Sequence, residues 1–263
     1  MLYLTFALEI FLVLALPVTL ALLLRRHAGV TWGLILAGAL AFVGSQVVHL
    51  PLNWILGLLG GGRGVALWPL PWMAVVAGLS AGVCEEIARY LVLRVWRRRD
   101  RSWVQGVAFG VGHGGVEAIF MGGLVLITLA NMLILRQVGP EVLGLSGDVL
   151  EQAQAQVDAY WSMAWYLPLL GGLERAFAMA IQIALSLMVL QAFVRDNWLW
   201  LMTAILAHAL VDGVVAFLGG VGWSPLALEG VVLLFALVGV ALILALRPAA
   251  DWRAANASRE NYT

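Results

Sequence analysis

Long apolar segments dominate this sequence and restrict what it can fold into. Of its 263 residues, 63% are hydrophobic and 11% are charged, and the mean hydropathy is +0.96. Soluble domains carry fewer apolar and more charged residues, so this composition predicts a protein that crosses a membrane several times. We therefore expect an all-α, polytopic transmembrane helical bundle whose main partner is the lipid bilayer, with no role in binding nucleic acid.

A helix that crosses a hydrocarbon core about 30 Å thick needs roughly 20 apolar residues. On this measure the sequence contains about seven spans. They cover residues 2–24, 30–50, 67–93, 103–135, 163–194, 198–218 and 223–246. The fourth and fifth are longer than necessary, so we expect them to be tilted or to break at glycine pairs. Those pairs are Gly114-Gly115, Gly122-Gly123 and Gly171-Gly172. An eighth, re-entrant element in the fourth stretch is the alternative, and residues 1–263 are expected to form one domain.

The basic residues, all of them Arg, are divided unevenly between the two ends of these spans. One end carries Arg25, Arg26, Arg94, Arg97, Arg98, Arg99, Arg101, Arg195, Arg247, Arg253 and Arg259. The other end carries only Arg63 and Arg136. The positive-inside rule then places the N-terminus outside and the C-terminus in the cytoplasm of a prokaryotic plasma membrane. The loop 136–162 is external on this topology, and its helical spacing indicates a helix on the membrane surface.

Seven ionisable residues lie inside segments that otherwise read as transmembrane helix. They are Glu85, Glu86, Arg89, His113, Glu117, His208 and Asp212. A charged side chain at the bilayer centre costs roughly 3 kcal/mol or more, so such residues usually face the protein interior and carry function. Counted from the cytoplasmic ends at about 1.5 Å per residue, Glu85, His113 and His208 each lie roughly 13–15 Å deep. Three spans are therefore expected to place reactive side chains at one level.

The acidic pair on the third span has a basic residue within reach. Arg89 follows Glu86 at i+3 and Glu85 at i+4, so its guanidinium can pair with either carboxylate. Consecutive helical residues point about 100° apart, so the two carboxylates cannot face one cleft equally. We expect one to pair with Arg89 and the other to remain available for chemistry. An ion pair that only joins helices is the alternative.

Each of the two deep histidines has an acid one helical turn later. Glycines flank His113 and let another backbone approach it closely, and Glu117 follows it at i+4. We expect Glu117 either to fix the His113 tautomer or simply to support packing through a hydrogen bond. Asp212 follows His208 at i+4, where it can orient His208, hydrogen-bond a reacting oxygen if protonated, or bind a metal.

A second polar cluster, Glu174-Arg175, occurs on the fifth span, with Gln182 two turns later. Helical rise places Glu174 toward the external side, so we expect a structural ion pair outside the reactive level. The alternative is that Glu174 and Arg175 line one cavity together with the reactive residues. The remaining acids and histidines of the spans have no motif around them and are expected to serve packing or the interface: Glu9, Glu229, His27 and His49.

Two imidazoles and a carboxylate at one depth allow two hydrolytic mechanisms. In one, Glu85, His113 and His208 hold a zinc ion that activates water. In the other, Glu85 and His113 act as the general base without a metal, and His208 with Asp212 stabilises the oxyanion. Zinc sites often place two ligands on one helix as His-Glu-x-x-His, which this sequence lacks. We therefore expect no cofactor, with zinc as the alternative.

The motifs resemble those of the glutamic-type intramembrane proteases. The similar elements are a Glu-Glu…Arg helix, Phe109-x-x-x-His113 and His208-x-x-x-Asp212. That superfamily includes the type II CAAX prenyl proteases, the bacterial CPBP proteins and the PrsW-type proteases. Within it, the chain most resembles the YhfC family. That likeness lies in the run from Gly112 to Ile119 and in Glu174-Arg175.

This resemblance implies an intramembrane endopeptidase that acts on a membrane protein or a lipidated peptide. It implies that Glu85, with Glu86 as the neighbouring candidate, is the base and that His113 positions the water. His208 and the residue four positions later would form the oxyanion pocket. The prenyl proteases, however, have Glu-Glu-x-x-x-Arg and commonly end the last motif in Asn. The earlier Arg89 and the Asp212 of this chain argue against prenylated CAAX substrates, because an ionised Asp repels an oxyanion.

Three other readings fit the buried ionisable residues. A proton-coupled transporter would use them as a relay, and inverted repeats, which we do not find, would support it. A haem protein would use His113 and His208 as axial ligands. A pseudoenzyme would keep the protease fold without turnover.

Overall fold

The computed structural model describes residues 1–248 as a bundle of long helices, and that part of the chain contains no strand. The long helices are α1 (Leu2–Ala28), α2 (Trp32–Leu56), α3 (Leu70–Leu91), α4 (Trp103–Val138), α6 (Leu167–Val194), α7 (Leu199–Gly220) and α8 (Pro225–Ala245). The shorter elements are η1 (Gly64–Leu67), η2 (Val92–Trp96), η3 (Pro140–Leu143) and α5 (Asp148–Ser162). Seven helices are long and apolar enough to cross a membrane, counting η2 as the end of α3, which confirms the predicted multi-pass all-α fold.

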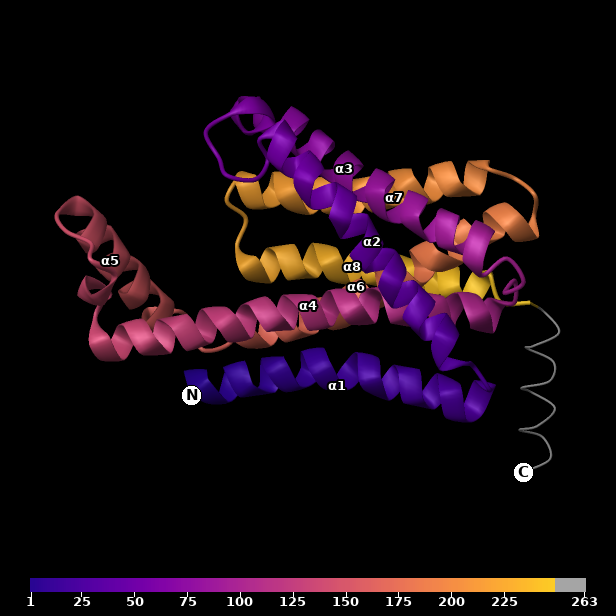
Figure 1. The fold of residues 1–263 in the computed structure, drawn as a ribbon, viewed down its shortest axis with the longest axis horizontal. Helices are drawn as coiled ribbons and strands as arrows, with labels where there is room; N and C mark the ends of the chain where they lie inside the picture. The colour runs from indigo at the N-terminus through magenta and orange to yellow at the C-terminus, as the bar shows by residue number, and fades with distance from the viewer. Residues whose placement is uncertain (249–263) are drawn as a thin grey trace.

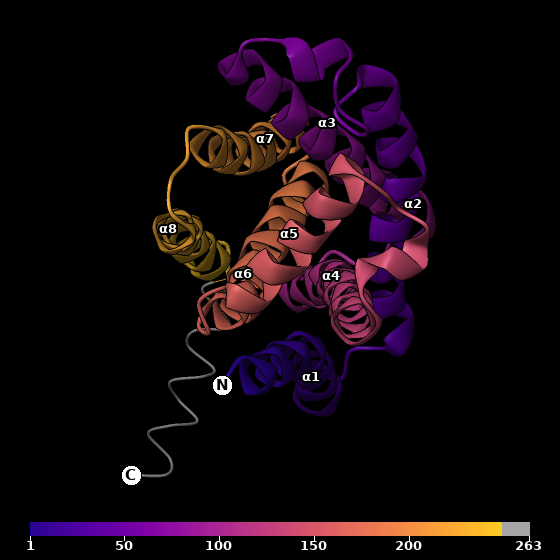
Figure 2. The ribbon, with the colours of Figure 1, turned by 90° about the vertical axis from the view of Figure 1, so that its left-hand side faces the viewer.

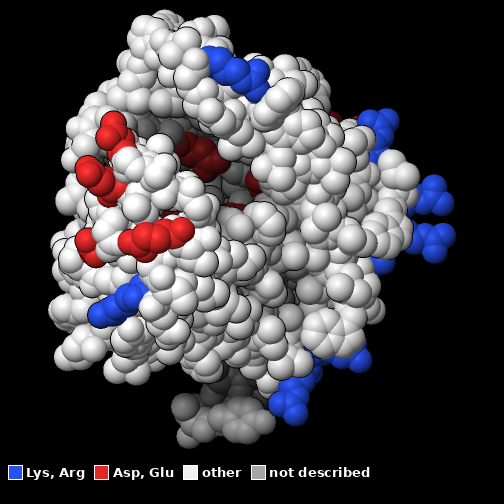
Figure 3. Space-filling model, turned by 60° about the vertical axis from the view of Figure 1, so that its left-hand side comes forward, with Lys and Arg blue, Asp and Glu red and all other residues white. Residues whose placement is uncertain are grey.

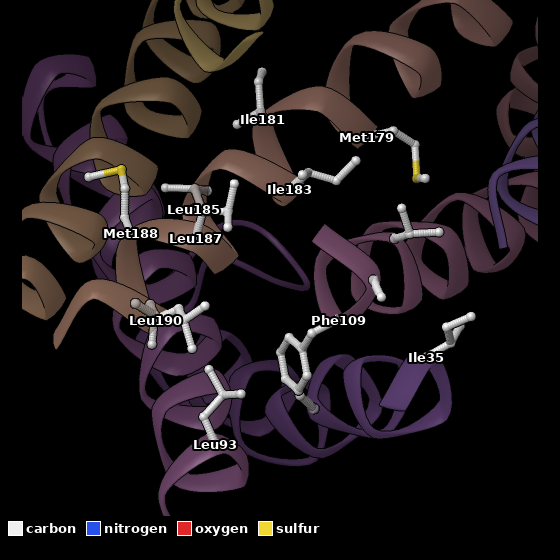
Figure 4. Close-up of a cluster of buried hydrophobic side chains, with 14 of the residues drawn as sticks. Ile35, Leu93, Phe109, Met179, Ile181, Ile183, Leu185, Leu187, Met188 and Leu190 are labelled. Carbon is white, nitrogen blue, oxygen red and sulfur yellow. The ribbon is translucent and has the colours of Figure 1, made fainter. Parts of the chain in front are cut away.

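Helix α6 forms the centre of the bundle. Helices α1, α4, α7 and α8 pack against it, and α2 and α3 complete the outer layer on the side of α4 and α7 (Figure 2). Every residue of α6 from Ile181 to Ala192 is buried, so this stretch is apolar nearly all round and lacks an amphipathic period. Its side chains meet Phe109 of α4 and Leu93 of η2 in one hydrophobic cluster (Figure 4).

The two over-long spans are continuous helices. Helix α4 runs for 36 residues and α6 for 28 residues without a break at their glycine pairs. The end of α4 extends past the rest of the bundle, where it connects to α5 (Figure 1). Of the two alternatives, tilt or a break, the break is therefore wrong, and α4 contains no re-entrant element. The helical spacing predicted within 136–162 corresponds to α5.

Glycines instead allow the helices to cross at close range. A Cβ on Gly112 of α4 would overlap the carbonyl oxygen of Ile35 in α2. A Cβ on Gly82 of α3 would lie 2.6 Å from the carbonyl oxygen of Ile205 in α7. Small residues let transmembrane helices approach backbone to backbone in this way. The first crossing holds α4 against α2 and the second holds α3 against α7, and α2 also packs against α3. The acids of α3 therefore lie close to residues of these neighbouring helices.

Charge separates along the long axis of the bundle. In Figure 3, Arg side chains gather at one end, while Asp and Glu side chains occur at the opposite end and inside a hollow in this face. Of the residues used to predict the topology, Arg253 and Arg259 lie outside the described residues. The orientation of the bundle in the membrane remains a prediction.

Candidate active site

Three helices bring the predicted reactive residues into contact. His113 Nε2 of α4 lies 3.0 Å from Glu85 Oε2 of α3. His208 Nε2 of α7 lies 4.0 Å from the same oxygen. Glu85, His113 and His208 are 6%, 0% and 4% exposed, so the cluster is shielded from the surroundings. The estimate from helical rise thus identified three side chains that meet, although their catalytic roles remain proposals.

Arg89 distinguishes the two acids of α3. Its Nη1 donates to both oxygens of Glu86, at 2.7 and 2.9 Å, whereas its Nη2 lies 3.5 Å from Glu85. Arg89 and Glu86 are both fully buried. A buried guanidinium and carboxylate are tolerable only as a well-paired set. Glu86 is therefore the structural partner of Arg89, and Glu85 is the acid that contacts His113 Nε2 and His208 Nε2.

The tautomer of His113 is set by Arg89 rather than by Glu117. Arg89 Nε donates to His113 Nδ1 at 3.3 Å, so Nδ1 is an acceptor and the ring proton lies on Nε2. That proton points at Glu85 Oε2. The ring of Phe42 packs edge-on against His113, with centroids 5.4 Å apart. The expectation that Glu117 fixes this tautomer is wrong, because Glu117 is hydrogen-bonded to α6.

His208 is oriented mainly by Glu86. Its Nδ1 donates to Glu86 Oε1 at 2.7 Å, whereas its Nε2 lies 3.5 Å from Asp212 Oδ2. The Asp212 side chain is 42% exposed, so it stands at the open edge of the site. Since Nδ1 is engaged, Nε2 is the His208 atom that remains available to a substrate.

Two glutamines complete the network. Gln182 of α6 accepts from Arg89 Nη2 and donates through Nε2 to Glu117 Oε2 at 2.6 Å. Gln46 of α2 donates to Glu85 Oε1 at 3.3 Å. Gln46 was not predicted from the sequence, and Gln182 was expected only in the second polar cluster with Glu174-Arg175. Gln182 lies seven residues after Arg175, and this helical spacing on one face was the available signal.

The expected separation of Glu174-Arg175 from the site is wrong. Arg175 Nη1 donates to Glu117 Oε1 at 3.3 Å, and Arg175 also pairs with Glu174. Both residues line one cavity with Glu117, His208 and Asp212. The depth of Glu174 was predicted from helical rise relative to the depth of the histidines alone. Glu117 and Asp212 lie one turn beyond those histidines, and the long Arg175 side chain spans the remaining distance.

His49 also departs from expectation, since it is not a simple interface residue. Its Nε2 lies 3.2 Å from Ser80 Oγ and 2.9 Å from Asn53 Nδ2. Ser80 in turn donates to Asn53 Oδ1 at 2.9 Å. These contacts form a polar link between α2 and α3 beside the main site.

The cavity beside the reactive cluster has a volume of about 300 Å³. Its lining includes the five polar residues named above for Glu174-Arg175, together with Gln182. It also includes apolar residues, among them Ile181, Val211, Val215 and Val232. A lining of both kinds can accommodate a peptide segment, whose backbone is polar and whose side chains can be apolar.

One group of residues has the spacing of a metal site. A ligand atom from each of Glu85, His113 and Glu117 lies within 4.8 Å of the others, and this is the one such group in the described part of the chain. Imidazole nitrogen and carboxylate oxygen are zinc ligands, and three protein ligands leave a position for water. The donor set therefore fits zinc, with Glu117 in the place where we expected His208. For Nε2 of His113 to be a ligand, its proton must move to Nδ1, so Arg89 Nε must give up its contact.

Replacing Gln182 is expected to destabilise the protein. Gln182→Leu would remove one of the hydrogen bonds of Arg89 and one of those of Glu117 at the centre of the bundle, which costs about 2–3 kcal/mol. Thermal unfolding of the purified protein checks this. Ser186→Ala is the matched control, since Ser186 lies one turn away, is fully buried and bonds only within α6. Equal effects of the two changes would contradict the role of Gln182.

Comparison with known proteins gives the family. A family model described as YhfC intramembrane metalloprotease matches residues 12–236. The uncharacterized membrane protein YhfC of Bacillus subtilis (strain 168) is 35% identical over 232 residues, which cover 86% of this chain and 88% of that protein. No solved structure matches the chain significantly. With a match that spans α1 to α8, this chain belongs to the YhfC intramembrane metalloprotease family.

Proposed function

We propose that this protein is an intramembrane endopeptidase that hydrolyses a peptide bond of a membrane-associated or membrane-spanning substrate. The observation that carries the proposal is the contact of Glu85 with His113 and His208, next to a cavity lined by both polar and apolar residues. The family description supports protease chemistry over transport or haem binding.

Glu85 is the proposed base. Its carboxylate accepts hydrogen bonds from Gln46 and His113, which fix its position without blocking every lone pair. A carboxylate held in this way can take a proton from an attacking water and pass it to the leaving amine. His113 orients that carboxylate and, through its Nε2 proton, the water beside it.

His208 is the proposed stabiliser of the oxyanion. Glu86 holds its Nδ1 at 2.7 Å, so the ring is fixed with Nε2 toward Asp212 and Glu85. An imidazolium in this orientation donates from Nε2 to the developing oxyanion, in an environment where few waters compete. Asp212, at the open edge, then balances the charge of His208.

The family description and the donor set favour zinc over the absence of a cofactor. Glu85, His113 and Glu117 would hold the metal, and Glu85 and His113 would then act as ligands in place of the base and water-orienting roles described above for a metal-free site. The group would supply polarisation of the substrate carbonyl and activation of a water near neutral pH. Gln182 and Arg175 fix Glu117 for this role, since they bond its two oxygens.

Metal analysis tests this assignment directly. We expect about one zinc per chain in protein purified without chelator, because three protein ligands are typical of catalytic zinc. His113→Ala should lose the metal, and Glu229→Gln, a change on α8 outside the proposed ligand group, should keep it. Elemental analysis of both variants is the measurement. Full cleavage by metal-free protein would instead assign water activation to Glu85 and His113 alone.

The substrate is best sought by comparing membrane proteomes. Cells that express the wild-type chain are compared with cells that express His208→Ala, and new protein termini are quantified. We expect termini within or beside transmembrane segments that occur only with the wild type. A cleavage that survives in His208→Ala, and in His113→Ala after reconstitution in liposomes, would contradict the proposed site.

A further inference from the structure

A second cavity lies toward the α5 end of the bundle, apart from the proposed active site. It has a volume of about 320 Å³ and is lined by residues of α1, α4, α5 and α6. Most of its lining is apolar, including Met121, Leu124 and Leu167. Its one acidic group is Glu9 of α1, which the proposed mechanism does not use.

Glu9 is a buried carboxylate without a hydrogen-bond partner. The residue is 6% exposed, and its Oε2 is enclosed with no partner in the described part of the chain. The absence of a side chain at Gly171 leaves space for the Glu9 carboxylate, because a Cβ there would lie 2.5 Å from Glu9 Oε1. Arg175, a cation that interacts electrostatically with Glu9, is already bonded to Glu117 and Glu174. A buried acceptor left in this state is costly unless something else supplies the donor.

The cavity wall suits a cation with an apolar stem. Phe6 and Tyr160 stack beside Glu9, with ring centroids 5.6 Å apart and planes 13° apart. Aromatic faces attract ammonium groups, and the apolar lining can cover an aliphatic chain. Burial raises the pKa of the Tyr160 hydroxyl, and the negative charge of the nearby Glu9 raises it further.

We propose that this cavity binds an alkylammonium group, with Glu9 accepting its N–H bonds and the aromatic pair beside it. The ammonium supplies the donors and the charge that Glu9 lacks, and its aliphatic stem occupies the apolar part of the cavity. The occupant that fits best is the lysine side chain of a peptide, because its four-carbon stem suits the mostly apolar lining, whereas an aminophospholipid headgroup would bring a phosphate into it. The proposal does not require the proposed peptidase activity.

Hexylamine and hexanol provide a matched pair of probes. With the full chain in phosphatidylcholine nanodiscs at pH 7, hexylamine should raise the Tm of the wild type in a saturable manner, and hexanol should not. Glu9→Gln should weaken the apparent hexylamine affinity roughly tenfold or more, because it removes a charge-assisted contact. Gly171→Ala, which displaces the carboxylate, should do the same.

Glu229→Gln is the matched control. Glu229 is another membrane acid whose Oε2 has no partner in residues 1–248, but it does not line this cavity. It should respond to hexylamine as the wild type does. Equal shifts with hexanol, or an unchanged response in Glu9→Gln, would overturn the proposal.

Competition identifies the source of the group. If phosphatidylethanolamine added to the nanodiscs reduces the hexylamine shift of the wild type, the natural occupant is a lipid headgroup. If an amidated N-acetyl-lysine peptide reduces it and phosphatidylethanolamine does not, the occupant is a peptide. The proposal fails if neither phosphatidylethanolamine nor the peptide competes and hexylamine binds equally well to Glu9→Gln. The cavity would then be apolar space without ligand specificity.

Discussion

Glu85→Gln is expected to lower the rate of peptide-bond cleavage by about 10²–10⁴-fold, the usual contribution of a general base. The amide matches the carboxylate in shape, so the change removes basicity with little change in packing. Glutamine can still accept the hydrogen bond from Gln46, but it can neither take a proton from water nor supply the carboxylate ligand of the zinc alternative. The measurement is cleavage of a substrate found in the proteome comparison, reconstituted with purified protein in liposomes.

The control for this change is Glu229→Gln, which alters an acid of α8 that lies outside the active-site network. It should cleave at the wild-type rate. The Tm of both variants should stay close to that of the wild type, so that lost activity cannot be ascribed to unfolding. Retention of more than half of the activity in Glu85→Gln would exclude Glu85 as the base.

Arg89→Leu is expected to destabilise the protein by about 3–5 kcal/mol, the range found when one partner of a buried ion pair is removed. Arg89 is 0% exposed and donates to Glu86, Gln182 and His113. Leucine fills part of the volume but leaves the Glu86 carboxylate buried beside a single donor from His208. Denaturant or thermal unfolding in detergent measures the loss.

A double variant tests the cause of this loss. Glu86→Leu combined with Arg89→Leu removes the unpaired charge as well, so it should recover part of the stability lost in the single variant. The double variant should not regain cleavage activity, because His208 would lose Glu86, the acceptor of its Nδ1 proton. A double variant that is less stable than Arg89→Leu alone would show that the network acts through packing rather than through charge.

Contacts within one helix could be predicted from the sequence. The pairing of Arg89 with an acid one turn earlier follows from helical spacing and needs no knowledge of the fold. The approach of His208 to Asp212 follows in the same way. Depth also placed the two histidines and Glu85 together, because helical rise is nearly constant and the bilayer fixes where each helix begins.

Contacts between helices could not be predicted in this way. Gln46 carries no charge, so nothing in the hydropathy of its span singled it out, and Gln182 was recognised only as a neighbour of Glu174-Arg175. Glu117 was expected to bond within its own helix, but its neighbours on α6 offer better donors. Which faces meet depends on the rotation of each helix about its axis, and close backbone contacts such as Gly112 with Ile35 set that rotation.

The sequence by itself determined the number of spans and the acids, bases and imidazoles that lie buried within them, because apolar length and the cost of buried charge are local properties. Only the tertiary structure decided that Glu86 pairs with Arg89 and that Glu85 contacts His113. It also joined Glu174-Arg175 to the cavity and placed Glu117 in the candidate metal group. Those outcomes depend on side chains from different helices reaching one point, and spacing along a single chain cannot encode how two helices are rotated against each other.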